Sequence, residues 1–310
     1  MTAHRIIALG ILALVVIGGL VNSTPLFAAD TTSTPQPCLG YHFHKGDSLV
    51  YKVFSYDTVV VYGKPTFVRE RTEHISIVCD YVDELGNMYL RQKLEKVLSK
   101  ESAGKDSAIR TTSHWVGRTA MIIMDSTGKR SLSRQYDTTR HAMSVGGPFQ
   151  PMLLPPLFDS LCHTAKNNRG WQLDVLDTLA ENGYPSPLLK HFYSYIIRGR
   201  VDTLGVHCTN LQYAETGQGS ILNNAENAQV YSRTVMNSSG SFYFSINRRV
   251  PITGIIECVN NLTIKMPNKP DTSAKSFTRT VFTLVYPALP NPVKKHILPT
   301  PMPNRKLKKK

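Results

Sequence analysis

The 310-residue sequence lacks the short motifs that mark common enzyme classes. It contains no Gly-x-Ser-x-Gly and no His-Glu-x-x-His, which disfavours a serine-hydrolase nucleophile elbow and a zinc-protease helix. Its five cysteines include no Cys-x-x-Cys pair, which disfavours a thioredoxin-type site or a zinc knuckle. We therefore expect a protein that is not an enzyme, with no cofactor, no catalytic residues and no metal site.

Long apolar runs are absent after residue 29. Residues 1–29 combine Arg5, an apolar stretch over residues 6–20 and the small residues Ala28 and Ala29, a pattern typical of a cleaved signal peptide. The alternative is an uncleaved anchor, but the run is shorter than the ~20 residues that a bilayer span takes. We expect export to the periplasm or the extracellular space.

Acidic residues are absent from residues 293–310, although the chain as a whole carries a net charge of +14. This end of the chain is also rich in proline, so residues 288–310 are expected to form a disordered basic tail. The tail either contacts an anionic envelope surface or simply aids solubility. Nucleic acid is disfavoured as a partner because export separates the protein from the nucleic acids of the cell, and because the sequence has no recognisable nucleic-acid-binding motif. The basic residues of the tail are Lys294, Lys295, Arg305, Lys306, Lys308, Lys309 and Lys310.

The cysteines and histidines leave several alternatives open. An exported chain can hold disulfides, and five cysteines allow at most two bridges with one thiol left over. Cys79 and Cys258 fall on apolar faces of expected strands, where small buried side chains are common. His42 and His44 share a face of an extended segment, but two imidazoles do not complete a metal site.

Alternating apolar and polar residues indicate β-strands over most of the remaining chain. Ile75, Ile77 and Cys79, for example, alternate with His74 and Ser76. Residues 88–100 also fit a helical stripe, but the short turn before them favours a strand. Turns are expected at Gly63-Lys64-Pro65, at residues 202–205 and at residues 237–240, and residues 216–227 are expected to form a polar loop. The expected strands cover residues 49–62, 67–82, 88–100, 111–125, 130–138, 192–201, 206–214, 230–236, 242–246, 252–266 and 277–286.

Short turns between the strands predict a mainly β, antiparallel fold with a curved sheet or sheets and few short helices. We expect it to be built from two hairpin-rich halves, residues 38–145 and 188–287. A linker over residues 30–37 precedes them, and a proline-rich connector over residues 146–187 joins them.

Residues 43–51, residues 83–90 and Gly170-Trp171 before the second set of hairpins carry a family resemblance. The sequence resembles exported bacterial β-rich proteins of unknown function, which are similar to the periplasmic lipoprotein-carrier fold. The resemblance implies a curved antiparallel sheet with an apolar concave face, and it supplies no catalytic residues.

These features favour a non-enzymatic envelope protein that binds an apolar ligand or a lipidated partner on the concave face. Phe192, Tyr195, Phe242 and Phe244 are the candidate lining residues, although aromatic side chains on one sheet face also form ordinary core. The alternative is a structural or interaction module that contacts the anionic envelope through its basic tail. A third hypothesis is a hydrolase, for which Asp174 and Asp177 would be a candidate carboxylate pair.

Overall fold

The computed structural model describes residues 38–111, 116–135, 153–159, 170–178, 188–225, 228–265 and 270–287. The predicted signal peptide, linker and basic tail lie outside the described residues. So does most of the predicted connector, of which residues 153–159 and 170–178 are described. No helix in the described part is long and apolar enough to cross a membrane.

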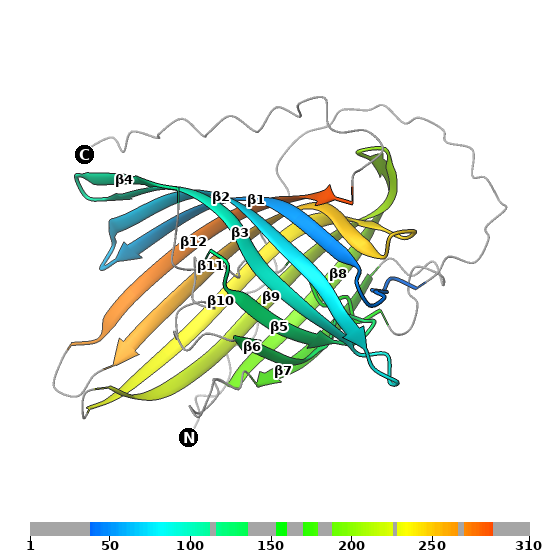
Figure 1. Cartoon of the computed structure of the whole chain (residues 1–310). Coiled ribbons are helices and arrows are strands. Elements are labelled where there is room, and N and C mark those ends of the chain that lie inside the picture. Colours follow the sequence, from blue (N-terminus) through cyan, green and yellow to red (C-terminus); the bar gives the residue numbers. More distant parts are fainter. Residues whose placement is uncertain are drawn as a thin grey trace, which may run out of the picture. The chain divides into compact units, whose positions relative to one another are not determined.

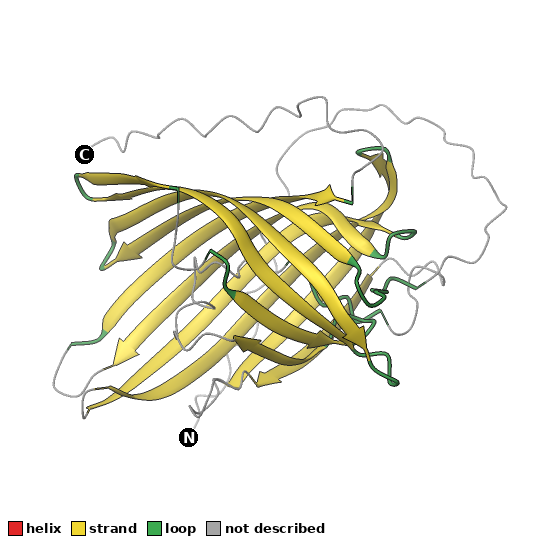
Figure 2. Cartoon of the chain, in the orientation of Figure 1, coloured by secondary structure: helices red, strands yellow, loops and turns green. Residues whose placement is uncertain are grey.

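The described part of the chain is built from β-strands, and it contains no helix (Figure 2). The strands are β1 (Ser48–Val61), β2 (Lys64–Val82), β3 (Met88–Ala103), β4 (Asp106–Arg110), β5 (Thr119–Met124), β6 (Arg130–Gln135), β7 (Gly170–Thr178), β8 (Leu188–Thr203), β9 (Val206–Ala225), β10 (Ala228–Ser245), β11 (Val250–Lys265) and β12 (Thr272–Tyr286).

All the described strands belong to one antiparallel sheet, with β4 pairing β3 beside the main path (Figure 1). The order is β6-β5-β3-β2-β1-β12-β11-β10-β9-β8-β7, so each half of the chain forms a meander of neighbouring strands. The first strand, β1, pairs with the last, β12, and this pairing joins the two meanders into a continuous sheet. The predicted mainly β, antiparallel fold class is confirmed, as is the β-rich character that the family resemblance implied.

Two hairpins close with the tightest kind of turn. Tyr62 and Gly63 link β1 to β2, and Leu204 and Gly205 link β8 to β9. All four residues have positive φ, between 48° and 76°. Two-residue turns of this conformation match the twist of the strands they connect. The turn predicted at residues 202–205 is therefore confirmed, and the turn after β1 lies one residue earlier than its Gly63-Lys64-Pro65 signal suggested.

The structure decides four local predictions, made where polar or ambiguous residues occur. Residues 88–100 are a strand, as expected, because β3 covers them. The polar loop expected at residues 216–227 is wrong, since β9 continues to Ala225. The turn expected at residues 237–240 is also wrong, because β10 runs unbroken through them. Among the described residues of the strand expected at residues 111–125, Thr119–Met124 alone are strand, as β5.

Gly240 and Ser238 explain why β10 does not turn. A Cβ atom at Gly240 would lie 2.2 Å from the Ile255 carbonyl oxygen and 3.0 Å from the Tyr213 ring, so only glycine fits there. The Ser238 hydroxyl hydrogen-bonds the Tyr213 hydroxyl at 2.9 Å across the strands. The polar and glycine residues that resemble a turn are thus used for close packing within the sheet.

Candidate functional site

One face of the sheet carries the core, and we call it the inner face. Along β1 the buried residues alternate with partly exposed ones from Leu49 to Asp57. Tyr51 lies opposite Ile75 on β2 and Leu284 on β12, so the buried side chains of neighbouring strands meet on the same face. This is the period-two pattern of a sheet with one covered side.

The inner face has an apolar half and a polar half. On β1 the change occurs between Val53, which is buried and apolar, and Ser55, which is buried and polar. The apolar half is lined by buried residues from eight strands: Leu49, Tyr51, Val53, Ile75, Ile77, Leu90, Leu94, Tyr195, Leu211, Phe242, Phe244, Ile252, Phe282 and Leu284.

A row of mostly polar residues marks the polar half. Each member lies opposite the next on the neighbouring strand, so the row crosses the inner face without a gap. We call it the polar row. From β8 to β3 its members are Tyr193, Glu215, Ser238, Cys258, Thr278, Asp57, Arg69 and Glu101.

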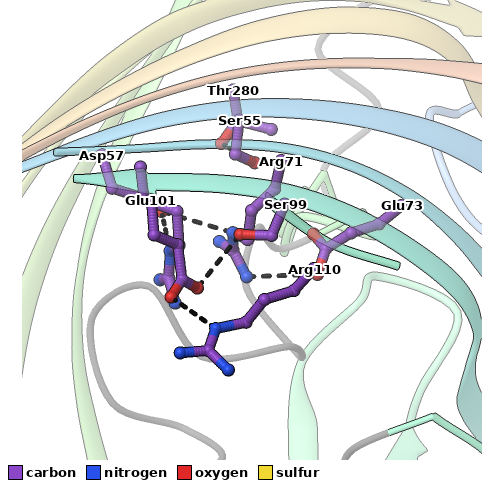
Figure 3. A network of polar contacts seen from close by, with 9 residues as sticks. Ser55, Asp57, Arg71, Glu73, Ser99, Glu101, Arg110 and Thr280 are labelled. Atoms are coloured by element: carbon purple, nitrogen blue, oxygen red, sulfur yellow. Dashed lines mark hydrogen bonds and ion pairs between the residues drawn. The ribbon is translucent and has the colours of Figure 1, made fainter. Parts of the chain in front are cut away.

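Asp57, Arg69, Arg71 and Glu73 form an ion-pair cluster at the β1–β2 end of this row (Figure 3). Asp57 Oδ2 lies 3.1 Å from Arg69 Nε and 3.3 Å from Arg71 Nε. Arg71 Nη1 donates to Glu73 Oε1 at 3.1 Å. Two acids and two bases are therefore paired in a mostly buried place, as buried ionisable groups require.

The cluster is nevertheless incompletely bonded. Asp57 Oδ1 and Glu73 Oε2 are buried and have no hydrogen-bond partner among the described residues. Burial raises the pKa of the Glu73 carboxyl group to about 7, against the opposing effects of Arg71 and Arg69. Removal of a carboxylate from water disfavours its charged form, and here this cost exceeds the attraction of the two guanidinium groups.

A second polar group lies at the β8–β9 end of the polar half. His191 Nδ1 lies 2.7 Å from Glu215 Oε1, and both side chains are about nine-tenths buried. The His191 ring stacks on Tyr193, with 5.7 Å between ring centroids. Gly217 leaves room for the imidazole, because a Cβ atom there would lie 3.1 Å from His191 Nδ1.

Aromatic rings line the apolar half beside these groups. Trp171 stacks on Tyr195 at 5.0 Å, and Tyr195 stacks on Tyr213 at 6.2 Å between centroids. Tyr213 in turn meets Phe242 at 6.0 Å. The rings continue from the edge strand β7 to β10, and each buries a large apolar area.

Residues 153–159 cover part of the apolar half, and we call them the strap. Leu153, Leu154 and Leu157 are fully buried in the same core cluster as the aromatic rings. The residues before β1 cover the face as well, since Leu39, Tyr41 and Phe43 belong to that cluster.

The four predicted lining residues do not share one environment. Phe192 lies on the opposite side of β8 from Tyr195 and is 39% exposed. Tyr195, Phe242 and Phe244 lie on the inner face and are fully buried in the core. Their role as ligand-lining residues stays a prediction, as does the surface contact of the basic tail, which lies outside the described residues.

The described histidines and cysteines do not come together in one site. The rings of His42 and His44 meet edge to face, and no group of three metal-binding side chains occurs among the described residues. Cys38 is disulfide-bonded, whereas Cys79, Cys208 and Cys258 are free.

Two clefts lie away from the aromatic rings. One of about 350 Å³ lies beside His42, Asp47 and Arg248, and one of about 360 Å³ lies beside His74 and Leu98. None of the four predicted lining residues borders either cleft.

The sequence did not reveal the polar half of the inner face. Asp57, Arg71 and Glu73 occur in segments that were correctly predicted as strands, but charged side chains are rarely fully buried, so nothing in their type indicated the covered side. The signal that could have found them is the two-residue period of the strands. Asp57 lies at an even spacing from the apolar Tyr51, and Arg71 and Glu73 lie at an even spacing from Ile75, which puts them on the same face.

No family model matches the chain, and no curated protein matches it. Among solved structures, the chain is similar to the loop-L8 deletion mutant of OmpT, an outer membrane protein of Vibrio cholerae, at 9% sequence identity and a TM-score of 0.17. That match covers 77% of this chain and 99% of the other. A likeness this low carries no argument about fold or function.

Proposed function

We propose that this chain is a non-enzymatic, exported envelope protein that binds an apolar ligand, or the lipid anchor of a partner, on the inner face of its sheet. The observation that carries the proposal is the division of that face into an apolar half and a polar half. A ligand with a hydrocarbon chain and a polar head group is complementary to both. The hydrocarbon contributes about 25 cal/mol per Å² buried before ordering costs.

The residue types of the inner face favour binding over catalysis. The charged side chains of the Asp57 cluster are paired with one another, and the free thiols lie in surroundings that hold them protonated. Burial raises the pKa of Cys79 to about 11 and that of Cys208 to about 12. A thiol with a raised pKa is a poor nucleophile at neutral pH.

Trp171 provides a reporter for the experiment that tests this function, since its ring stacks on Tyr195 in the apolar half. The chain has two tryptophans, so Trp115→Phe leaves Trp171 as the only one. We expect a phospholipid with brominated acyl chains to quench Trp171 fluorescence in the delipidated protein, and the same lipid without bromine to leave it unquenched. Absence of quenching, together with absence of lipid in mass spectra of natively purified protein, would contradict the proposal.

A second role is favoured by the seven basic residues and the lack of acid over residues 293–310. We propose that this tail contacts an anionic envelope surface. Deletion of residues 293–310 should then abolish salt-sensitive binding to vesicles that contain phosphatidylglycerol, because screening weakens such contacts. Equal binding by the full-length and truncated chains would reject this role.

A further inference from the structure

The strap joins parts of the sheet that are distant in the strand order. The amides of Leu157 and Phe158 both donate to the Thr127 carbonyl, in the turn between β5 and β6. On the other side, the Trp171 indole on β7 donates to the Leu157 carbonyl at 2.8 Å. The strap therefore holds β5–β6 and β7 to the same short segment, although these strands lie toward opposite ends of the sheet.

Three aromatic side chains give their polar groups to consecutive carbonyls of the strap. The Tyr41 hydroxyl donates to the Pro155 carbonyl at 2.7 Å, and the Tyr195 hydroxyl donates to the Pro156 carbonyl. The Trp171 indole donates to the next carbonyl, that of Leu157. Burial of these hydroxyl and N–H groups without a partner would be costly, so whatever covers the apolar half must supply acceptors.

The strap supplies acceptors and hydrocarbon together. Pro155 and Pro156 have no backbone N–H, so at these positions the backbone offers carbonyl oxygens alone. Leu153, Leu154 and Leu157 add fully buried aliphatic side chains. A fatty-acyl ester has the same chemistry. It places a hydrocarbon chain next to a carbonyl oxygen that accepts hydrogen bonds and has no N–H beside it.

We propose that the strap acts as an intramolecular ligand, which an ester-linked acyl lipid displaces when it binds the inner face. In the bound state, the ester carbonyls of the lipid accept the hydrogen bonds of Tyr41, Tyr195 and Trp171, and the acyl chains replace the leucines of the strap. This inference rests on the proposed lipid-binding function and adds two things to it. It names the acyl ester as the recognised group, and it makes displacement of the strap a condition of binding.

Two lipids and three variants test the proposal. The lipids are dihexanoylphosphatidylcholine and its ether-linked analogue, which has the same chains and head group but lacks the carbonyls. The wild-type chain should bind the ester about tenfold more tightly, because loss of the acceptors leaves buried donors unpaired. Tyr41→Phe and Tyr195→Phe, singly and together, should reduce this preference while leaving the rings in place.

Tyr62→Phe is the matched control. The Tyr62 hydroxyl also makes a hydrogen bond, to the Thr272 hydroxyl at 2.8 Å, but the side chain is 60% exposed in the turn between β1 and β2. Tyr62 is not one of the residues that line the apolar half. This variant should therefore keep the ester preference of the wild-type chain, so a change caused by the loss of any tyrosine hydroxyl would be recognised.

Hydrogen exchange at the Leu157 and Phe158 amides measures directly whether the strap leaves the sheet. Saturation with the ester lipid should speed exchange at these two amides and leave the β12 amides unchanged. If the lipid binds while both strap amides stay protected, or if the ester and ether lipids bind equally, the displacement mechanism is overturned and lipid binding stands. If no variant binds either lipid, the proposed function fails together with the inference.

Discussion

Phe242 and Phe282 pack against Gly254 from its two sides on the inner face of the sheet. Gly254 lies opposite Phe242 on β10 and opposite Phe282 on β12. A Cβ atom at Gly254 would lie 2.6 Å from Phe282 Cζ and 2.8 Å from Phe242 Cβ. The missing side chain of one strand thus makes room for rings of the strands on both sides.

Gly254→Ala should destabilise the chain by about 1–3 kcal/mol, because neither ring can move within a close-packed core. Without the clash, alanine would be the better residue inside a strand. Chemical denaturation measures the unfolding free energy. Glu257→Ala, at an exposed position of the same strand, is the control and should change it by less than about 0.5 kcal/mol. A stable Gly254→Ala variant would show that the rings do not close on this glycine.

Glu73 should make the chain less stable as pH rises. Its folded-state pKa is about 7, above the ordinary value of 4.5, so between these pH values the folded state holds a proton that the unfolded state has lost. The stabilising contribution is complete below about pH 4.5 and is lost as the pH rises through about 7, which corresponds to about 3 kcal/mol.

Denaturation of the wild-type chain and Glu73→Gln at pH 5 and pH 8 measures this effect. The amide cannot ionise, so the variant should lose less stability than the wild-type chain between these pH values. Glu257→Gln, at an exposed carboxyl group, should follow the wild-type curve. Parallel curves for all three proteins would mean that Glu73 is already charged at pH 5.

The thiol count should distinguish one disulfide from two. Cys79, Cys208 and Cys258 are free and Cys38 is bonded, so the unfolded, unreduced chain should release three reactive thiols of its five cysteines. In the folded chain these thiols should react slowly at pH 7, since burial raises the pKa of Cys258 to about 11 and those of the other two to about 11 and 12. A single thiol after unfolding would indicate two bridges.

Truncation of Phe192 and truncation of Phe242 should change the unfolding free energy by very different amounts. Phe192→Ser should change the unfolding free energy by less than about 0.5 kcal/mol, because the ring lies on the exposed side of β8. Phe242→Ala should cost about 3–5 kcal/mol, because that ring is fully buried. Quenching of Trp171 by the brominated lipid should be unaffected by Phe192→Ser. Loss of quenching in that variant would place the ligand on the outer side of β8.

The sequence predicted strands well where a single strand carries its own signal. Ile75, Ile77 and Cys79 alternate with polar residues because one side of β2 is covered and the other is not. Leu204-Gly205 predicted its turn because only a few residues tolerate positive φ. In both cases the cause lies within a few residues of the chain, so local pattern was sufficient.

The polar half of the inner face could not be predicted, because the contacts that bury its residues are made with neighbouring strands and not within one strand. Residues 216–225 and 237–240 look like loop and turn, yet Gly217 accommodates His191 and Gly240 accommodates Tyr213 from neighbouring strands. The ion pair between Asp57 and Arg71 likewise joins side chains of two neighbouring strands, β1 and β2.

By itself, the sequence determined the strand-forming character of the chain, its antiparallel hairpins and its apolar alternation. Only the tertiary structure decided that β1 pairs with β12, that polar residues share the covered face, and that the strap lies against the aromatic rings. The physical reason is that backbone conformation and alternation are encoded in neighbouring residues. Partners for a buried hydroxyl group, such as Pro155 for Tyr41 and Pro251 for Tyr51, come from segments far along the chain, and they become neighbours only when the sheet forms.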